Sequence, residues 1–123
     1  MATYQYKMTN GGKVIEQTSL TAAATSEVIN LNPRHTAMGV QCIVTNNTDL
    51  VGSVEVQLSN DGETWQDATF SDDSTSITVA SATNATDLRS IALSGFRFAR
   101  VTFTHTSSTT GGDLTVNVSF SKG

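Results

Sequence analysis

The clearest pattern along the chain is an alternation of apolar and polar residues near its middle. Val54, Val56 and Leu58 alternate with polar residues, which is the period of a strand with one buried face and one wet face. The turn-forming run Ser-Asn-Asp-Gly follows directly, and Trp65 then opens the returning strand. We expect a tight hairpin here, with the indole buried as an anchor of the core.

Further strands are indicated by the same alternation elsewhere. Between Met38 and Val44, apolar residues that include Cys42 share one face, and a cysteine in such a row is most simply a small core side chain. The last strand alternates cleanly and ends at Phe120. Apart from the hairpin, the segments expected to form strands are 26–31, 38–44, 77–79, 96–105 and 114–120.

The strand expected at 96–105 changes phase along its length. Val101 and Phe103 share one face, whereas Phe96 and Phe98 share the other. Because a strand keeps its period of two unless a residue is inserted, this pattern predicts a bulge or a strand that is covered on both faces.

About eight strands at such spacing predict an all-β fold, a single antiparallel β-sandwich of jelly-roll type. The chain has 123 residues, which is enough for one domain with a two-layer core. Only 15% of the residues are charged, while serine, threonine and asparagine are frequent, which favours extended structure over helices. The residues expected to anchor the core are Cys42, Trp65, Val101, Phe103 and Phe120.

The beginning of the chain is expected to form an element of its own. Tyr4, Tyr6 and Met8 share one face of a short strand, and an Asn-Gly-Gly turn leads to a return strand. We therefore assign residues 1–17 to a hairpin or arm that packs on the domain or on a neighbour, and residues 18–123 to the sandwich. Tyrosine and methionine are enriched at interfaces, so these three are the expected contact residues; the alternative is that they edge the core.

The charge of the chain narrows the classes of partner. A net charge of -4 argues against nucleic acid or an anionic membrane surface. Arg97 and Arg100 are expected on opposite faces of their strand, so they make no basic patch.

The single cysteine forms no internal disulfide, and no apolar run approaches the ~20 residues of a membrane helix. The N-terminus lacks a charged-then-apolar signal, so we expect synthesis in a cytoplasm without a secretion label.

The sequence favours a non-enzyme with no cofactor and no metal. His35 and His105 are the only histidines, and neither lies at a metal-ligand spacing. Nucleophile-elbow and phosphate-loop motifs are absent from the sequence. Acidic loop residues can ligate calcium, although solvated turns are the commoner role of such residues. The residues concerned are Asp61, Glu63, Asp72 and Asp73.

Three motifs carry a resemblance to a known group of proteins. They are Ser-Asn-Asp-Gly-x-x-Trp at 59–65, Gly-Phe-Arg-Phe-Ala-Arg-Val at 95–101 and Gly-Gly-Asp-Leu-Thr-Val-Asn-Val at 111–118, with Lys-Gly at the end. Together they resemble small virion proteins of tailed and tailless phages over about the last 70 residues of the sequence. The resemblance implies a capsid-associated or tail-associated structural subunit.

A weaker resemblance concerns the motif at 95–101 alone. It is similar to a strand of discoidin-type, galactose-binding-like jelly rolls, which bind glycans or lipids through loops at one end. The disulfide that usually joins their termini is impossible with one cysteine, and the loops at 46–51 and 107–112 contain no aromatic residue. Both departures lower the expectation of sugar binding.

Taken together, these features favour a structural component of a phage virion, with a capsid decoration or cement subunit as the leading assignment. The alternatives are a tail, neck or spike subunit, or a carbohydrate-binding adsorption module. The expected partners are other virion proteins and further copies of the chain. A homo-oligomer such as a trimer would suit the local symmetry of an icosahedral shell. Such a protein would be assembled in the host cytoplasm and reside in the virion.

Overall fold

The computed structural model describes residues 11–31, 35–93 and 95–122. Within them the chain forms ten strands and no helix, and hence no helix long and apolar enough to cross a membrane. The strands are β1 (Gly11–Leu20), β2 (Ala24–Thr25), β3 (Ile29–Asn30), β4 (His35–Thr45), β5 (Val51–Ser59), β6 (Gln66–Asp67), β7 (Ile77–Val79), β8 (Ala85–Ala92), β9 (Phe98–Ser107) and β10 (Gly112–Lys122).

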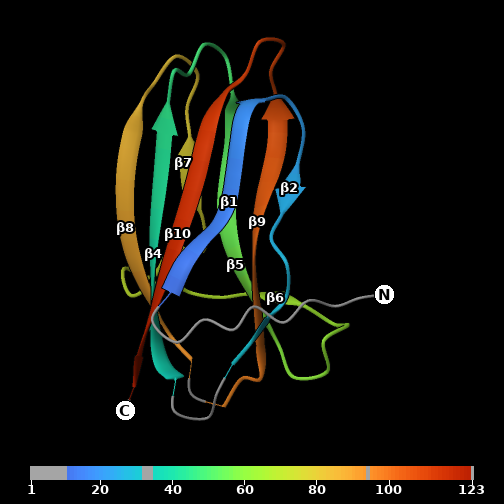
Figure 1. Cartoon of the computed structure of the whole chain (residues 1–123), viewed down its shortest axis with the longest axis vertical. Coiled ribbons are helices and arrows are strands. Elements are labelled where there is room, and N and C mark those ends of the chain that lie inside the picture. Colours follow the sequence, from blue (N-terminus) through green and yellow to red (C-terminus); the bar gives the residue numbers. More distant parts are fainter. Residues whose placement is uncertain (1–10, 32–34, 94, 123) are drawn as a thin grey trace.

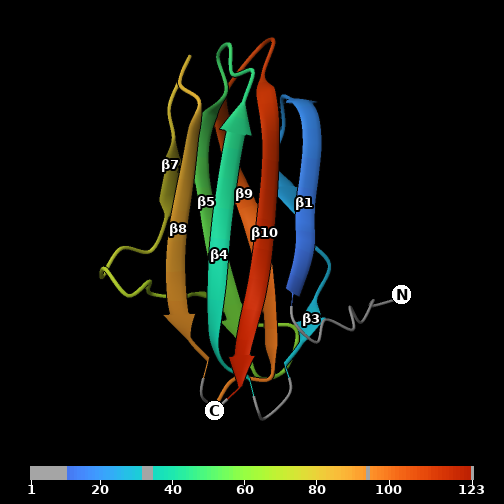
Figure 2. The same cartoon turned by 60° about the vertical axis from the view of Figure 1, so that its left-hand side comes forward.

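The strands form two sheets that face each other (Figure 1). Sheet A has the order β1-β10-β4-β8, and sheet B has the order β2-β9-β5-β6, with β3 also paired to β9 and β7 also paired to β5. Every pairing is antiparallel. Figure 2 shows sheet A in front of sheet B, with β4 and β10 at the centre of sheet A.

This connectivity is that of a jelly roll. The pairs β2 with β3 and β6 with β7 each flank the same central strand, so each pair acts as one interrupted edge strand. Counted in this way the fold has eight strand positions, and all but one connection crosses between the sheets, as in a double-sheet jelly roll. The predicted all-β sandwich is therefore confirmed. The higher strand count arises because these edges are broken.

The interruption between β2 and β3 has a visible cause. Ser26 lies between them, and its backbone N–H donates to the carbonyl of Val101 at 2.8 Å. Its hydroxyl accepts from the N–H of Val101, also at 2.8 Å, in place of a backbone carbonyl. A side chain thus completes the ladder where the backbone bends away, which is a common way to end pairing at a sheet edge.

The core lies between the sheets and follows the predicted alternation. On β5, Val54, Val56 and Leu58 are buried, and the residues between them face outward. Cys42, Val101 and Phe103 are at most 2% exposed within this core.

Two of the expected core anchors lie elsewhere. Phe120 is partly buried against the core, and its ring stacks on that of His35 at a centroid distance of 4.7 Å. Trp65 is half-buried and is not part of the core cluster, so the expectation of a core indole is wrong. The residues that point inward from its segment are Ala68 and Phe70.

The phase change expected in the strand at 96–105 disappears in the structure. β9 begins at Phe98, so Phe96 lies before the strand, in a turn closed by a 3.1 Å bond from its N–H to the carbonyl of Leu93. Pairing with β5 is regular from Ser59 to Gly52, and its one irregularity lies at the far end, between Gly52 and Val51. The expectation of a bulge at the phase change, or of cover on both faces, is therefore corrected.

The expected contact residues Tyr4, Tyr6 and Met8 lie outside the described residues. So does the first strand of the expected hairpin at 3–8, which leaves that hairpin a prediction. The boundary assigned after residue 17 falls inside β1, which pairs with β10 along its length, with register shifts after Lys13 and after Gln17. Among the described residues, β1 is thus an edge strand of sheet A.

Candidate functional site

The most exposed large apolar side chains of the described residues lie on one side of the sandwich. Leu88 is 71% exposed and Phe96 is 41% exposed. Leu88 belongs to β8, and Phe96 lies in the turn just beyond that strand. We call the surface formed by Leu88, Ile91, Ala92 and Phe96 the β8 side. Exposed large apolar side chains along one edge of a sheet make that edge a candidate contact surface.

The position of β8 at the edge of sheet A explains why Leu88 is exposed. Within the part of the chain that the structure describes, β8 pairs with β4 only, from Ala85 opposite Val44 to Ala92 opposite Ala37. Along it the partly buried residues Asp87 and Arg89 alternate with exposed ones, so Leu88 projects from the outer face.

An arginine closes the open edge of the core beside β8. The Arg89 guanidinium lies 2.7 Å from the carboxylate of Asp72 and 3.7 Å from that of Asp87. It also lies over the ring of Phe70, with its Cζ 5.8 Å from the ring centre. A charged group that points inward at an edge strand discourages pairing with a further strand, because that pairing would desolvate it.

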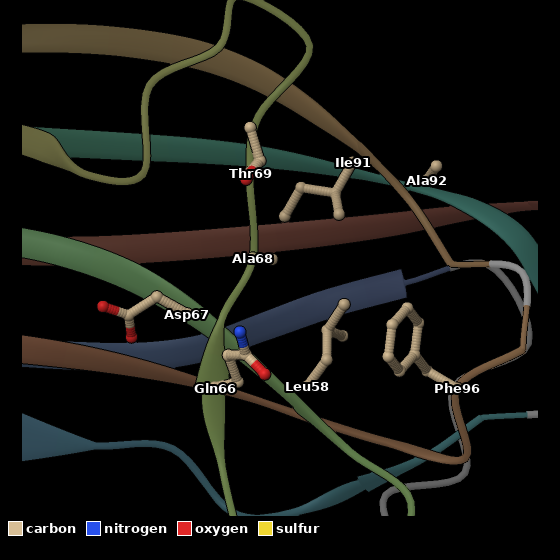
Figure 3. Close-up of a pocket in the computed structure, with 8 residues that line it drawn as sticks. All are labelled: Leu58, Gln66, Asp67, Ala68, Thr69, Ile91, Ala92 and Phe96. Atoms are coloured by element: carbon tan, nitrogen blue, oxygen red, sulfur yellow. The ribbon is translucent and has the colours of Figure 1, made fainter.

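A hollow of about 320 Å³ opens next to the end of β8. Its apolar walls come from Leu58, Ala68, Ile91, Ala92 and Phe96. Figure 3 shows the Phe96 ring facing Leu58, with the polar side chains of the neighbouring segment on the other flank. We call it the β8 groove; its polar lining residues are Gln66, Asp67 and Thr69.

The segment that follows β6 forms one wall of the groove and ties the two sheets together. The N–H of Ala68 donates to the carbonyl of Val56 on sheet B at 2.8 Å. The N–H of Ser71 donates to the carbonyl of Ser90 on sheet A at 2.9 Å. This segment therefore covers the free edge of β8 near Ser90, which hinders the addition of a further strand there. The groove lies beside this covered part of the edge.

The acidic loop residues have partners within the protein. The Asp61 carboxylate accepts from the backbone N–H groups of Glu63 and Thr64, each at 2.8 Å, and these bonds hold its pKa well below the usual range. The Asp72 carboxylate accepts from Ser74 and from Arg89. Across the described ranges, no three histidine, cysteine or acidic residues are grouped so as to hold a metal ion.

The two histidines and the cysteine, which were considered as catalytic or metal-binding residues, do not form a common site. His35 is buried against Phe120, and His105 shares a 2.7 Å hydrogen bond with the hydroxyl of Ser108. Burial raises the pKa of the Cys42 thiol to about 12. Cys42 is therefore protonated at neutral pH. Because the thiolate is the reactive form of cysteine, we expect this core side chain to be unreactive.

Trp65 lies on the outer face of sheet B instead of in the core. The turn before it is fixed by the Ser59 hydroxyl, which accepts from the N–H groups of Asp61 and Gly62. The chain then leaves the turn on the solvent side of β5, and the guanidinium of Arg100 covers the indole with its Cζ 4.3 Å from the ring centre. The local sequence pattern alone predicts neither the position of Trp65 on the outer face of sheet B nor the existence of the β8 groove.

Comparison with known proteins identifies the fold. No model of a known protein family matches the sequence, and no curated protein is similar to it in sequence. The crystal structure of the SPBc2 prophage-derived protein YomS matches 87% of this chain and 92% of that chain, with a TM-score of 0.56 and 10% identity. A structure described as "Bacillus endospore appendages form a novel family of disulfide-linked pili" matches 100% of this chain and 96% of that chain, with a TM-score of 0.41 and 16% identity. The chain thus shares its fold with a prophage-derived protein.

Proposed function

We propose that this protein is a structural, non-catalytic component of a phage virion, and that it decorates the capsid. The observation that carries the proposal is the β8 side, where Phe96 lines an open apolar groove at the end of β8 and Leu88 is exposed on the outer face of the same strand. The fold shared with a prophage-derived protein and the three sequence motifs that resemble phage virion proteins support it.

The β8 groove is suited to one apolar side chain of a neighbouring virion subunit. Leu58 and Ile91 are buried at its floor, and the Phe96 ring forms a wall against which such a side chain packs. Gln66 and Thr69 at the flank offer amide and hydroxyl groups to the partner backbone. Leu88 extends the contact along the outer face of sheet A. A stable interface of this kind buries roughly 1,000 Å² or more in total.

A decoration protein that binds in this way stabilises the shell by mass action. It binds the assembled form and not the free subunits, so each bound copy shifts the equilibrium toward the assembled shell. Further copies of this chain would be arranged with the symmetry of the shell, for which a trimer is suited. In this proposal the protein is assembled in the host cytoplasm and remains in the virion.

The presence of the chain in particles tests the proposal directly. Particles are purified from the strain that carries the gene, heads are separated from tails, and the chain is quantified by mass spectrometry against the major shell protein. Decoration predicts a copy number comparable with that of the shell subunit, in the head fraction. A few copies in the tail fraction would make it a tail, neck or spike subunit. Absence from both fractions would overturn the structural role.

Matched variants test the β8 side as the contact surface. Leu88→Asp and Phe96→Asp place a charge at the proposed interface, and both side chains are exposed, so we expect the fold to persist. Gln17→Asp adds the same charge on β1, at the opposite edge of sheet A. Particles that lack the protein should bind the first two variants about tenfold or more weakly than the wild type and the control, because a buried unpaired charge is costly. Equal binding of all three would exclude this surface.

A further inference from the structure

Two arginines lie against aromatic rings on the outer face of sheet B. The Cζ of Arg100 is 4.3 Å from the centre of the Trp65 ring, and the Cζ of Arg97 is 5.5 Å from that of the Phe98 ring. The expectation that the arginines point to opposite faces is therefore wrong. Arg97 precedes β9, so the alternation of that strand does not set its direction. Its guanidinium lies over the ring of Phe98, which is on the same face of β9 as Arg100.

The Arg100 guanidinium is held in place by a short chain of polar contacts. Its Nε donates to the side-chain carbonyl of Gln57 at 2.8 Å, and the Gln57 amide donates to the Asp67 carboxylate at 3.0 Å. The cation–π contact with Trp65 holds the guanidinium against the indole on one side. A cation that is already oriented loses little conformational entropy when a ligand binds.

These two arginines have no carboxylate partner among the residues that the structure describes. The arginine ion pairs found there belong to Arg89, which contacts Asp72 and Asp87. Burial lowers the pKa of the Arg100 guanidinium. Arginine in proteins stays protonated at neutral pH, so this group carries its positive charge. A chain with a net charge of -4 thus presents, on the outer side of sheet B, two arginines that form no ion pair within the described residues.

The surroundings of the arginines are rich in hydrogen-bonding groups. The Glu55 carboxylate accepts from Thr104 at 2.9 Å and from Thr102 at 3.4 Å, on the strands that also carry Gln57 and Arg100. The face therefore combines an aromatic plane, fixed cations and a row of hydroxyl, amide and carboxylate groups. A sugar ring has both C–H surfaces that pack on an indole and hydroxyls that bind such groups.

We propose that this face, formed by Trp65, Arg97, Phe98, Arg100 and Gln57, binds an acidic saccharide. The anionic substituent would accept hydrogen bonds from the guanidinium groups, which match the geometry of carboxylate and phosphate oxygens. The sugar ring would pack against the exposed part of Trp65, and Gln57 would bind its hydroxyls. The inference does not depend on a role in the virion, since it uses neither Leu88 nor Phe96.

Titration with three saccharides tests the proposal and distinguishes the source of the anion. The probes are tri-galacturonic acid, which carries carboxylates, glucose 6-phosphate, and neutral maltotriose. Trp65 is the only tryptophan, so its fluorescence and its single indole N–H signal report binding at this face. We expect a saturable change with at least one acidic probe, and the probe that binds identifies carboxylate or phosphate as the preferred anion. No change with either acidic probe would overturn the proposal.

Variants and inorganic phosphate separate a saccharide site from simple charge attraction. Arg100→Gln should weaken binding about tenfold or more, since charge-assisted bonds to the anion are lost. Lys13→Gln removes one positive charge from β1 on the other sheet and should bind like the wild type. Thermal melting of both variants checks that they are folded. Equal binding by Arg100→Gln and the wild type, or an affinity for inorganic phosphate equal to that for the acidic saccharide, would contradict the proposal.

Discussion

The carboxylate of Asp49 accepts a hydrogen bond of 2.6 Å from the backbone N–H of Gly111, a residue 62 positions further along the chain. The same carboxylate accepts from the N–H groups of Thr109 and Thr110. One side chain in the β4–β5 connection thus accepts from three successive backbone N–H groups of the β9–β10 connection. These bonds favour the ionised carboxylate and lower the pKa of Asp49 to about 2, from an ordinary value of 3.8.

We therefore predict that the protein loses stability as the solution is acidified below about pH 4. The folded-state pKa of Asp49 is below its unfolded-state value, so the stabilisation is complete above the unfolded pKa and is lost as the pH falls toward about 2. The pKa values of Asp61, Asp72 and Asp113 are lowered in the same direction. Thermal melting followed by circular dichroism over this pH range measures the loss. Asp49→Asn should melt lower at neutral pH and show a shallower acid dependence; a slope equal to that of the wild type would contradict this account.

Replacing Trp65 should destabilise the fold far less than replacing a core aromatic residue. Phe103 is 1% exposed between the sheets, so Phe103→Ala should cost about 3–5 kcal/mol of unfolding free energy. Trp65 is half-buried outside the core, and its replacement by alanine removes chiefly the contact with Arg100 and partial cover of the sheet face, about 1–2 kcal/mol. Urea unfolding followed by circular dichroism compares the two variants. An equal loss of unfolding free energy for Trp65→Ala and Phe103→Ala would contradict this account and indicate that the indole packs in the core.

The contrast between these two aromatic residues shows how far local sequence patterns reach. The alternation of Val54, Val56 and Leu58 predicted both the strand and its buried face, because a period of two needs only neighbouring residues. The segment after the turn has no such period, since β6 is only two residues long. Whether Trp65 enters the core is decided by where the chain emerges from the turn, which the pattern does not contain.

The candidate sites depended on topology in the same way. No strand was predicted around Leu88, but the structure places it on β8, an edge strand of sheet A within the described residues, so its outer face meets solvent. Phe96 and Arg97 were counted into a strand that begins only at Phe98. Because β9 begins two residues later than predicted, Phe96 lies at the β8 groove and Arg97 lies against the Phe98 ring. Strand order and strand boundaries depend on contacts between distant segments, which a single sequence does not specify locally.

The Cys42 thiol should be inert in the folded protein. It is 2% exposed, and burial raises its pKa to about 12, so the thiolate population at neutral pH is very small. An aromatic disulfide reagent should therefore modify it slowly in native buffer and rapidly in concentrated urea. The native rate is set by opening of the sandwich, so a destabilising core variant such as Phe103→Ala should accelerate it. Rapid stoichiometric labelling of the native wild-type protein would show that the thiol is accessible.

Two glycines with similar backbone angles should respond differently to alanine. Gly95 and Gly111 have φ angles of +91° and +84°, which an L side chain rarely adopts, so each alanine variant pays a similar conformational cost of about 1–2 kcal/mol. A Cβ at Gly95 would meet no non-neighbouring atom of the described residues within 4 Å, whereas a Cβ at Gly111 would lie 2.1 Å from the carbonyl oxygen of Leu20. Gly111→Ala must therefore also displace the end of β1, which should add about 1–3 kcal/mol. Urea unfolding of both variants measures the difference. Equal losses would mean that β1 yields at its end without cost, since the shared backbone strain cancels between the two.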